Sequence, residues 1–108
     1  MIRFGQVIKV KPEMLEYYLE LHANPWPEVL ETIRKCNISN YSIYLLRKDL
    51  LFAYFEYTGN DFDADMKKMA ACPHTQKWWS ETNPCQEPMN IKDGEWWHNM
   101  KEIFHFDD

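Results

Sequence analysis

Two runs of β-forming residues joined by a very short connection constrain this fold more than any other feature. Residues 38–46 and 50–58 are rich in isoleucine, leucine, tyrosine and phenylalanine, with Arg47-Lys48-Asp49 between them. So short a connection makes the strands antiparallel neighbours. In the first strand, Tyr41 shares a side with Ser39, Ile43 and Leu45. The sequence therefore predicts a central hairpin that carries Tyr41 on one face.

Helical patterns precede this hairpin. Residues 12–22 repeat apolar side chains at helical spacing after a proline suited to a first turn. A second helix is predicted to start at Trp26-Pro27-Glu28 and to end at Asn37, with Val29, Leu30 and Ile33 facing the core.

Helical signals also follow the hairpin. Asp61 is placed to cap a helix that ends near residue 71, and Pro73 marks either a kink or a new helical start. Residues 83–94 contain two prolines and a glycine, and so long a connection suits a loop that covers a site.

Alternating residues at both ends of the chain predict two further strands, residues 3–11 and Met100 to Phe106. The order strand, helix pair, hairpin, helix pair, strand predicts an α+β fold, a ferredoxin-like antiparallel sheet with helices on one face. We expect a single domain over residues 1–108. The bare sheet face predicts a homodimer that packs sheet on sheet.

Composition argues against several classes of protein. The formal charge is −5, from 12 basic and 17 acidic residues, so a nucleic-acid partner is not expected. The start of the chain lacks signal-peptide features and no apolar run is long enough to span a membrane, which predicts a cytoplasmic protein without a membrane partner. Three widely spaced cysteines fit free thiols better than disulfides.

Motifs for metal or cofactor binding are missing. Cys72, His74, Cys85 and His98 match no standard zinc spacing, so no metal site is expected. With three glycines, the chain also lacks a phosphate-binding glycine loop. We expect no cofactor.

The remaining candidates for chemistry are one histidine and several aromatic residues. His22 lies one helical turn after Tyr18, near a helix end, and its alternative interpretation is a solvent-facing or structurally satisfied histidine. Trp78 and Trp79 are adjacent, so on a helix they diverge by about 100° and one could enter the core while the other lines a site. Indole rings suit stacking on the C–H face of a pyranose.

Short motifs in order along the chain resemble the L-rhamnose mutarotase family. These motifs are Tyr18, His22, Pro25-Trp26-Pro27-Glu28, Asn40-Tyr41-Ser42-Ile43-Tyr44-Leu45, Leu51-Phe52-Ala53, Trp78-Trp79 and Glu102-Ile103-Phe104-His105. The resemblance implies a dimeric α/β barrel. It also implies that His22 is the proton donor and that Tyr18, Tyr41, Trp78 and Trp79 bind the sugar.

The function implied by this resemblance is interconversion of the α and β anomers of a free deoxyhexopyranose by acid–base ring opening. The segment Asn83-Pro84-Cys85-Gln86-Glu87-Pro88 departs from the family's usual loop, so L-fucose is an alternative to L-rhamnose. Two other classes share the architecture, namely cofactor-independent monooxygenases and ligand-binding barrels without catalysis.

Overall fold

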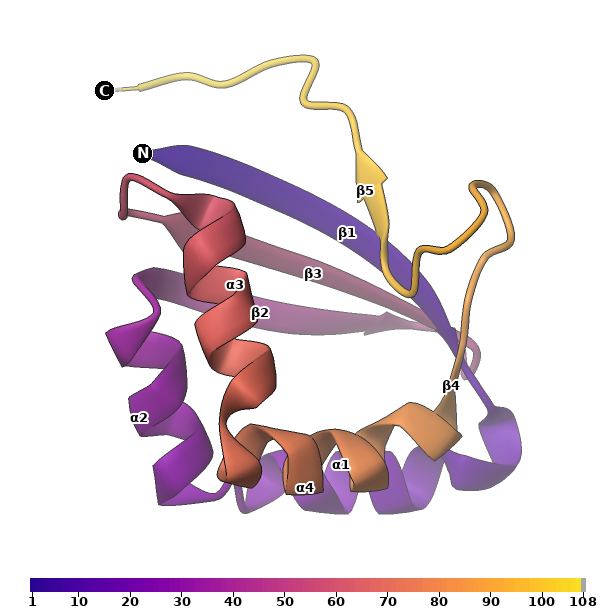
Figure 1. Ribbon diagram of the computed structural model, residues 1–108. Helices are drawn as coiled ribbons and strands as arrows, with labels where there is room; N and C mark the ends of the chain where they lie inside the picture. The colour runs from indigo at the N-terminus through magenta and orange to yellow at the C-terminus, as the bar shows by residue number, and fades with distance from the viewer. Residues whose placement is uncertain (108) are drawn as a thin grey trace.

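Four α-helices cover one side of a curled antiparallel sheet (Figure 1). The computed structural model describes residues 1–107. The strands are β1 (Ile2–Val10), β2 (Ile38–Leu46), β3 (Leu50–Tyr57), β4 (Gln86–Glu87) and β5 (His98–Met100). The helices are α1 (Leu15–Ala23), α2 (Pro27–Lys35), α3 (Phe62–Ala71) and α4 (Pro73–Thr82), with short 3-10 turns η1 (Pro12–Met14) and η2 (Asn83–Cys85). No helix within these residues is long and apolar enough to cross a membrane.

The sheet has the predicted ferredoxin-like topology. Its strand order is β2-β3-β1-β4, and β5 pairs with β1 beside β4. All pairings are antiparallel, and β1 is a central strand in the register Phe4↔Phe55 and Gln6↔Ala53. The hairpin and the α+β class predicted from sequence are therefore confirmed.

Local chemistry explains where α3 and α4 begin. The Asp61 side chain accepts a hydrogen bond from the Ala64 backbone N–H at 3.1 Å, which caps α3 as predicted. Pro73 is the first residue of α4, where its missing N–H costs nothing. Of the two possibilities at Pro73, the chain adopts the new helix.

A closed hydrogen-bond cluster joins β3 to α3. The Tyr57 hydroxyl donates to Asp65 Oδ2 at 2.5 Å and accepts the Asp61 backbone N–H at 3.0 Å. Asn37 Nδ2 also donates to Asp65, at 2.9 Å. A Cβ on Gly59 would lie only 2.8 Å from Asn37 Nδ2 and closer still to the Tyr57 ring, so the turn after β3 needs glycine.

Two predictions about side-chain direction are wrong. Leu30 is 46% exposed because it lies about 100° around α2 from the buried Val29. In β2, Ser39 does not share a face with Tyr41, because a bulge between Ser39 and Ser42 inserts an extra residue. Asn40 adopts a positive φ of 50° at this bulge.

The predicted last strand, Met100 to Phe106, is also wrong. Pairing of β5 with β1 stops at Met100, and residues 101–107 form no regular structure. Ile103, Phe104 and Phe106 are 89%, 80% and 72% exposed. The apolar residues alternate as in a strand, but the backbone of this segment pairs with no other strand within residues 1–107. A strand needs such a hydrogen-bonded neighbour.

Candidate active site

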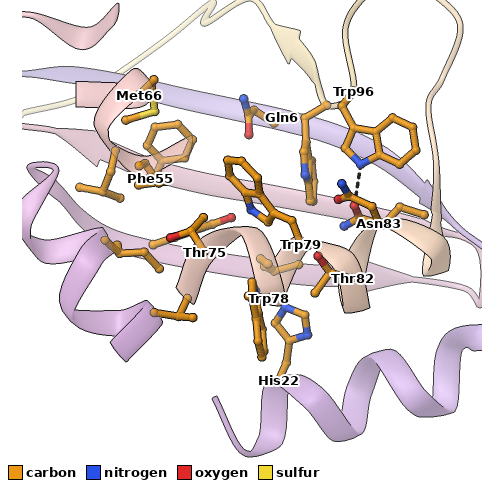
Figure 2. A pocket seen from close by; sticks show the side chains of 18 of the residues that line it. Gln6, His22, Phe55, Met66, Thr75, Trp78, Trp79, Thr82, Asn83 and Trp96 are labelled. Carbon is orange, nitrogen blue, oxygen red and sulfur yellow. Dashed lines mark hydrogen bonds between the residues drawn. The ribbon is translucent and has the colours of Figure 1, made fainter. Parts of the chain in front are cut away.

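A cavity of about 400 Å³ lies between the helices and the covered sheet face. Its size is within the range typical of small-molecule sites. One end is polar, with His22, Asn83 and Trp96 in its wall (Figure 2), and Tyr18 and Gln86 also line the cavity. The other end is apolar and is lined by residues of α2, β3 and α3, including Ile33, Phe55, Phe62, Met66 and Met69.

His22 stands in the cavity wall with a defined tautomer. Its ring rises from α1 toward α4, and it packs at 4.3 Å from the Tyr18 ring and 5.3 Å from Trp78, centroid to centroid. Nδ1 lies 2.8 Å from the Tyr18 backbone carbonyl. Because a carbonyl only accepts, Nδ1 must carry the proton. Burial lowers the pKa of His22, so near neutrality the imidazole is uncharged and its Nε2 is a free base.

Tyr18 is buried, and its hydroxyl is held by a glutamine. The phenol is 3% exposed and accepts a hydrogen bond from Gln86 Nε2 at 3.0 Å. Burial raises the pKa of Tyr18 far above its usual value of about 10, which keeps the phenol protonated. Gln86 Oε1 in turn accepts from Trp96 Nε1 at 2.8 Å, the bond drawn as a dashed line in Figure 2.

The two adjacent tryptophans of α4 diverge. Trp78 is buried and makes edge contacts with His22 and with Trp26, whereas Trp79 is more exposed and points from α4 toward the sheet (Figure 2). Both line the cavity. Tyr41 also lines it and packs on Phe55 at 5.6 Å, while 43% of its surface stays exposed. The five residues suggested by the resemblance thus border one cavity.

Sequence reasoning missed the contribution of other side chains to this cavity. Gln6, Thr75, Thr82, Asn83 and Gln86 add polar groups to its wall. The start of the predicted covering loop reaches the cavity through Asn83 and Gln86, and Trp96 and Trp97 reach it just beyond the end of that loop. The adjacent tryptophans Trp96 and Trp97, which follow the loop in the sequence, are the signal that could have indicated this second contact. The Thr75 hydroxyl is buried and makes no hydrogen bond of ordinary geometry within residues 1–107, although it lies near the Cys72 thiol and, after Thr32, helps to lower the pKa of that thiol. In the same range, no cluster of three histidine, cysteine or acidic side chains is arranged to hold a metal ion.

The fold and this site define a class of protein: a curled α+β half-barrel with a small-molecule cavity under its helices. Comparison with known proteins narrows that class. The sequence profile of the L-rhamnose mutarotase family matches residues 3–106, so the chain belongs to this family.

Individual relatives agree with the profile. The chain is 32% identical to the L-rhamnose mutarotase of Shouchella clausii, over 97% of this chain and 98% of that protein. It is 31% identical to that of Lactiplantibacillus plantarum, over 99% of this chain and all of that protein.

Two solved structures share the fold. The L-rhamnose mutarotase of Formosa agariphila superposes with a TM-score of 0.76 at 20% identity, covering 99% of this chain and 100% of that one. A type-II polyketide cyclase from Streptomyces glaucescens gives 0.69 at 12% identity, covering 100% and 99%. These likenesses establish the architecture alone.

Proposed function

We propose that this chain is a sugar mutarotase that interconverts the α and β anomers of L-rhamnose. Its family and its curated relatives carry that activity in their names. The observation that carries the proposal is the pairing, in one cavity wall, of an unprotonated imidazole nitrogen on His22 with a phenol on Tyr18 that remains protonated. Mutarotation needs these two abilities, to accept one proton and to supply another.

Ring opening moves one proton from O1 of the sugar to O5. His22 Nε2 takes the O1 proton while the O1–H electron pair forms the C1=O1 double bond. The C1–O5 bond breaks, and the electron pair left on O5 takes the proton of Tyr18. After rotation about C1–C2, the same two transfers run backward on the other face of C1, so imidazole and phenol return to their starting states.

This assignment refines the role that the family resemblance implies for His22. With Nδ1–H donated to a backbone carbonyl, the neutral ring enters the reaction as a base and becomes a proton donor only on reclosure. We propose that Trp79 and Tyr41, which line the cavity, contact the sugar, and that Trp78, which packs edge-on against His22, supports that ring. The apolar end of the cavity suits the C6 methyl group of a deoxyhexose.

Anomer exchange measured by saturation-transfer NMR on L-rhamnose and L-fucose tests the proposal. We expect the wild type to accelerate anomer exchange, and to do so more for L-rhamnose than for L-fucose. The His22→Ala variant should be about 10²–10⁴-fold slower than the wild type. His74→Ala is the matched control, because His74 is exposed on α4 and does not line the cavity. Absence of acceleration on either sugar would refute a mutarotase and favour a binding barrel or a monooxygenase-like enzyme.

We further propose that the chain forms a homodimer through the open sheet face. Tyr44 and Leu46 of β2 and Met100 of β5 are 64%, 50% and 41% exposed. In the irregular segment 101–107 that follows β5, the apolar side chains of Ile103, Phe104 and Phe106 are also exposed. Exposed apolar surface of this kind marks an interface. Sedimentation equilibrium should give twice the monomer mass, and Tyr44→Asp should shift the distribution toward monomer.

A cytoplasmic location is part of the same proposal. Cys36, Cys72 and Cys85 are free thiols, which suits a reducing compartment. Fractionation of the producing cells, with a known cytoplasmic enzyme as reference, tests this placement.

A further inference from the structure

The segment after α4 brings two residues, Gln86 and Trp96, into a hydrogen-bond chain with Tyr18. Gln86 in β4 is 5% exposed and lies between the Tyr18 hydroxyl and the Trp96 indole. β4 pairs with β1 at Val10↔Gln86, which fixes the Gln86 backbone to the sheet. Three side chains that are distant in sequence thus form one continuous hydrogen-bond chain.

The direction of this chain follows from its outer member. An indole N–H only donates, so the group facing Trp96 must be the Gln86 carbonyl oxygen. The Gln86 amide N–H groups then face Tyr18, and the Tyr18 oxygen must accept. The phenol proton is consequently not used by Gln86, and it has no other acceptor within residues 1–107. It is left to point toward a ligand in the cavity.

We propose that Gln86 and Trp96 are positioning residues that hold Tyr18 as a hydrogen-bond donor toward the ring oxygen of the sugar. This inference rests on the proposed function. Without Trp96 the Gln86 amide could turn over, present its oxygen to Tyr18 and take up the phenol proton. The chain therefore sets which of the two reacting groups is the acid, and His22 is left as the base.

The groups in direct hydrogen-bond contact with this chain are uncharged, and charged side chains lie one residue further away. Besides burial and the Gln86 bond, the neighbours that affect the pKa of Tyr18 are Tyr41 from β2 and Cys85 from η2, and both raise it. His22 from α1 is neutral near pH 7. Lys9 and Lys11 flank Val10, the β1 partner of Gln86. Burial and then Glu81 raise the pKa of Cys85, and Lys11 opposes them. On the Trp96 loop, Glu95 is already bonded to His98 at 2.6 Å.

Gln86→Glu tests the direction of the chain by reversing it. An ionised carboxylate only accepts, so Tyr18 would donate its proton to the carboxylate and lose its donor role toward the sugar. We expect the kcat for anomer exchange to fall about 10²-fold at pH 8, comparable to removal of one donor from a developing oxyanion. A protonated carboxyl can again donate to Tyr18 while accepting from Trp96, so acidification should restore activity.

Recovery of kcat on acidification of the Gln86→Glu variant would not be expected if Gln86 had a purely structural role. Burial would raise the pKa of this carboxyl from its usual value of about 4.3, and hydrogen bonds from Tyr18 and Trp96 would lower it. The ratio of variant to wild-type kcat should therefore climb as the pH falls toward the pKa of the carboxyl. A ratio that stays low at every pH, or a variant as active as wild type, would overturn the inference. Glu87→Gln, the reverse exchange at the exposed neighbouring position, is the matched control and should leave the rate unchanged.

A second variant keeps the inference testable if Gln86→Glu does not fold. Trp96 is 39% exposed, so Trp96→Phe should fold normally while freeing the Gln86 amide to adopt both orientations. We expect kcat to fall about two-fold, because either amide orientation can bond the Tyr18 hydroxyl and about half of the molecules then hold it in the wrong direction. The change in kcat decides, since Trp96 lines the cavity and its loss can also change KM. An unchanged kcat would contradict the inference, whereas an inactive wild type would instead refute the mutarotase function itself.

Discussion

Tyr18 and Tyr57 are two buried tyrosines, one in each of the two core clusters of the protein, and each belongs to a hydrogen-bond chain. The chain at Tyr57 is closed, because its hydroxyl both accepts from the Asp61 backbone and donates to Asp65. The chain at Tyr18 is open, because its hydroxyl accepts from Gln86 and has no acceptor for its own proton within residues 1–107.

This difference separates scaffold from site. A buried polar group with every bond made stabilises one conformation, whereas a buried group with an unused bond costs free energy until a ligand completes it. Burial raises the pKa of both phenols, so the pKa shift by itself does not distinguish them. The hydrogen-bond partners do, and they predict opposite consequences for the same substitution.

Tyr18→Phe should have the larger effect, and on activity. It removes the hydroxyl that we propose acts on O5, so kcat/KM for L-rhamnose should fall about 10²–10³-fold. Stability should fall less than in Tyr57→Phe, since only the bond from Gln86 Nε2 is lost, whereas the Tyr57 hydroxyl makes two bonds. Saturation-transfer NMR gives the rate, and thermal unfolding followed by circular dichroism gives the Tm. A stable variant with full activity would show that the open chain has no catalytic use.

Tyr57→Phe should show the reverse pattern. The substitution leaves the Asp65 carboxylate and the Asp61 N–H without the hydroxyl that joins them. Losing these bonds should lower the Tm by roughly 5–10 °C, while kcat changes less than about two-fold. A loss of activity at a temperature where this variant is fully folded would contradict the separation of the two chains.

As the pH falls, activity at the site of His22 and Tyr18 should decline before the closed hydrogen-bond chain at Tyr57 and Asp65 loses stability. The pKa of His22 is lowered by burial, so the acid limb of kcat/KM should lie below about pH 6.5, with an approximately ten-fold loss for each further unit. Because the folded state binds this proton less readily than the unfolded chain, His22 also reduces stability below that pH.

The Asp65 carboxylate responds at lower pH. Its pKa is lowered by the hydrogen bonds from Tyr57 and Asn37, so its contribution to stability is complete above the unfolded value of about 3.9 and is lost as the pH falls through the folded value. Rate and circular dichroism measured on the same samples should therefore show activity declining while the fold persists. Simultaneous loss of both would contradict this order.

The sequence predicted most of the fold, because its signals are local. A three-residue connection specified the hairpin, Asp61 the cap of α3, and Pro73 the start of α4. The strand from Met100 to Phe106 was mispredicted. Alternation of apolar and polar residues predicts where side chains would point in a strand, but it does not reveal whether a partner strand is present. The bulge in β2 was missed for a related reason, since it depends on the register with β3.

The site was predictable only in part. His22, Tyr18, Tyr41, Trp78 and Trp79 came from short motifs, and they do border one cavity. Gln86 and Trp96 are ten residues apart on an irregular loop, so no periodicity relates them to Tyr18, 68 positions earlier than Gln86. Thr75 was also missed, because no pattern reveals a helical threonine whose hydroxyl lacks a partner.

Thr75→Val sharpens the comparison with the smallest expected effect. The hydroxyl of Thr75, on α4, is buried and makes no hydrogen bond of ordinary geometry within residues 1–107. Like the hydroxyl of Tyr18, it therefore has an unused hydrogen bond. Valine keeps the shape and removes an unsatisfied polar atom, so stability should stay equal or rise slightly. If the hydroxyl binds a sugar oxygen, KM for L-rhamnose should increase about 2–10-fold with kcat preserved. An unchanged KM would mean that the open hydrogen bond at Thr75 is a packing defect, and that an unused bond marks the site only where a second group such as His22 stands beside it.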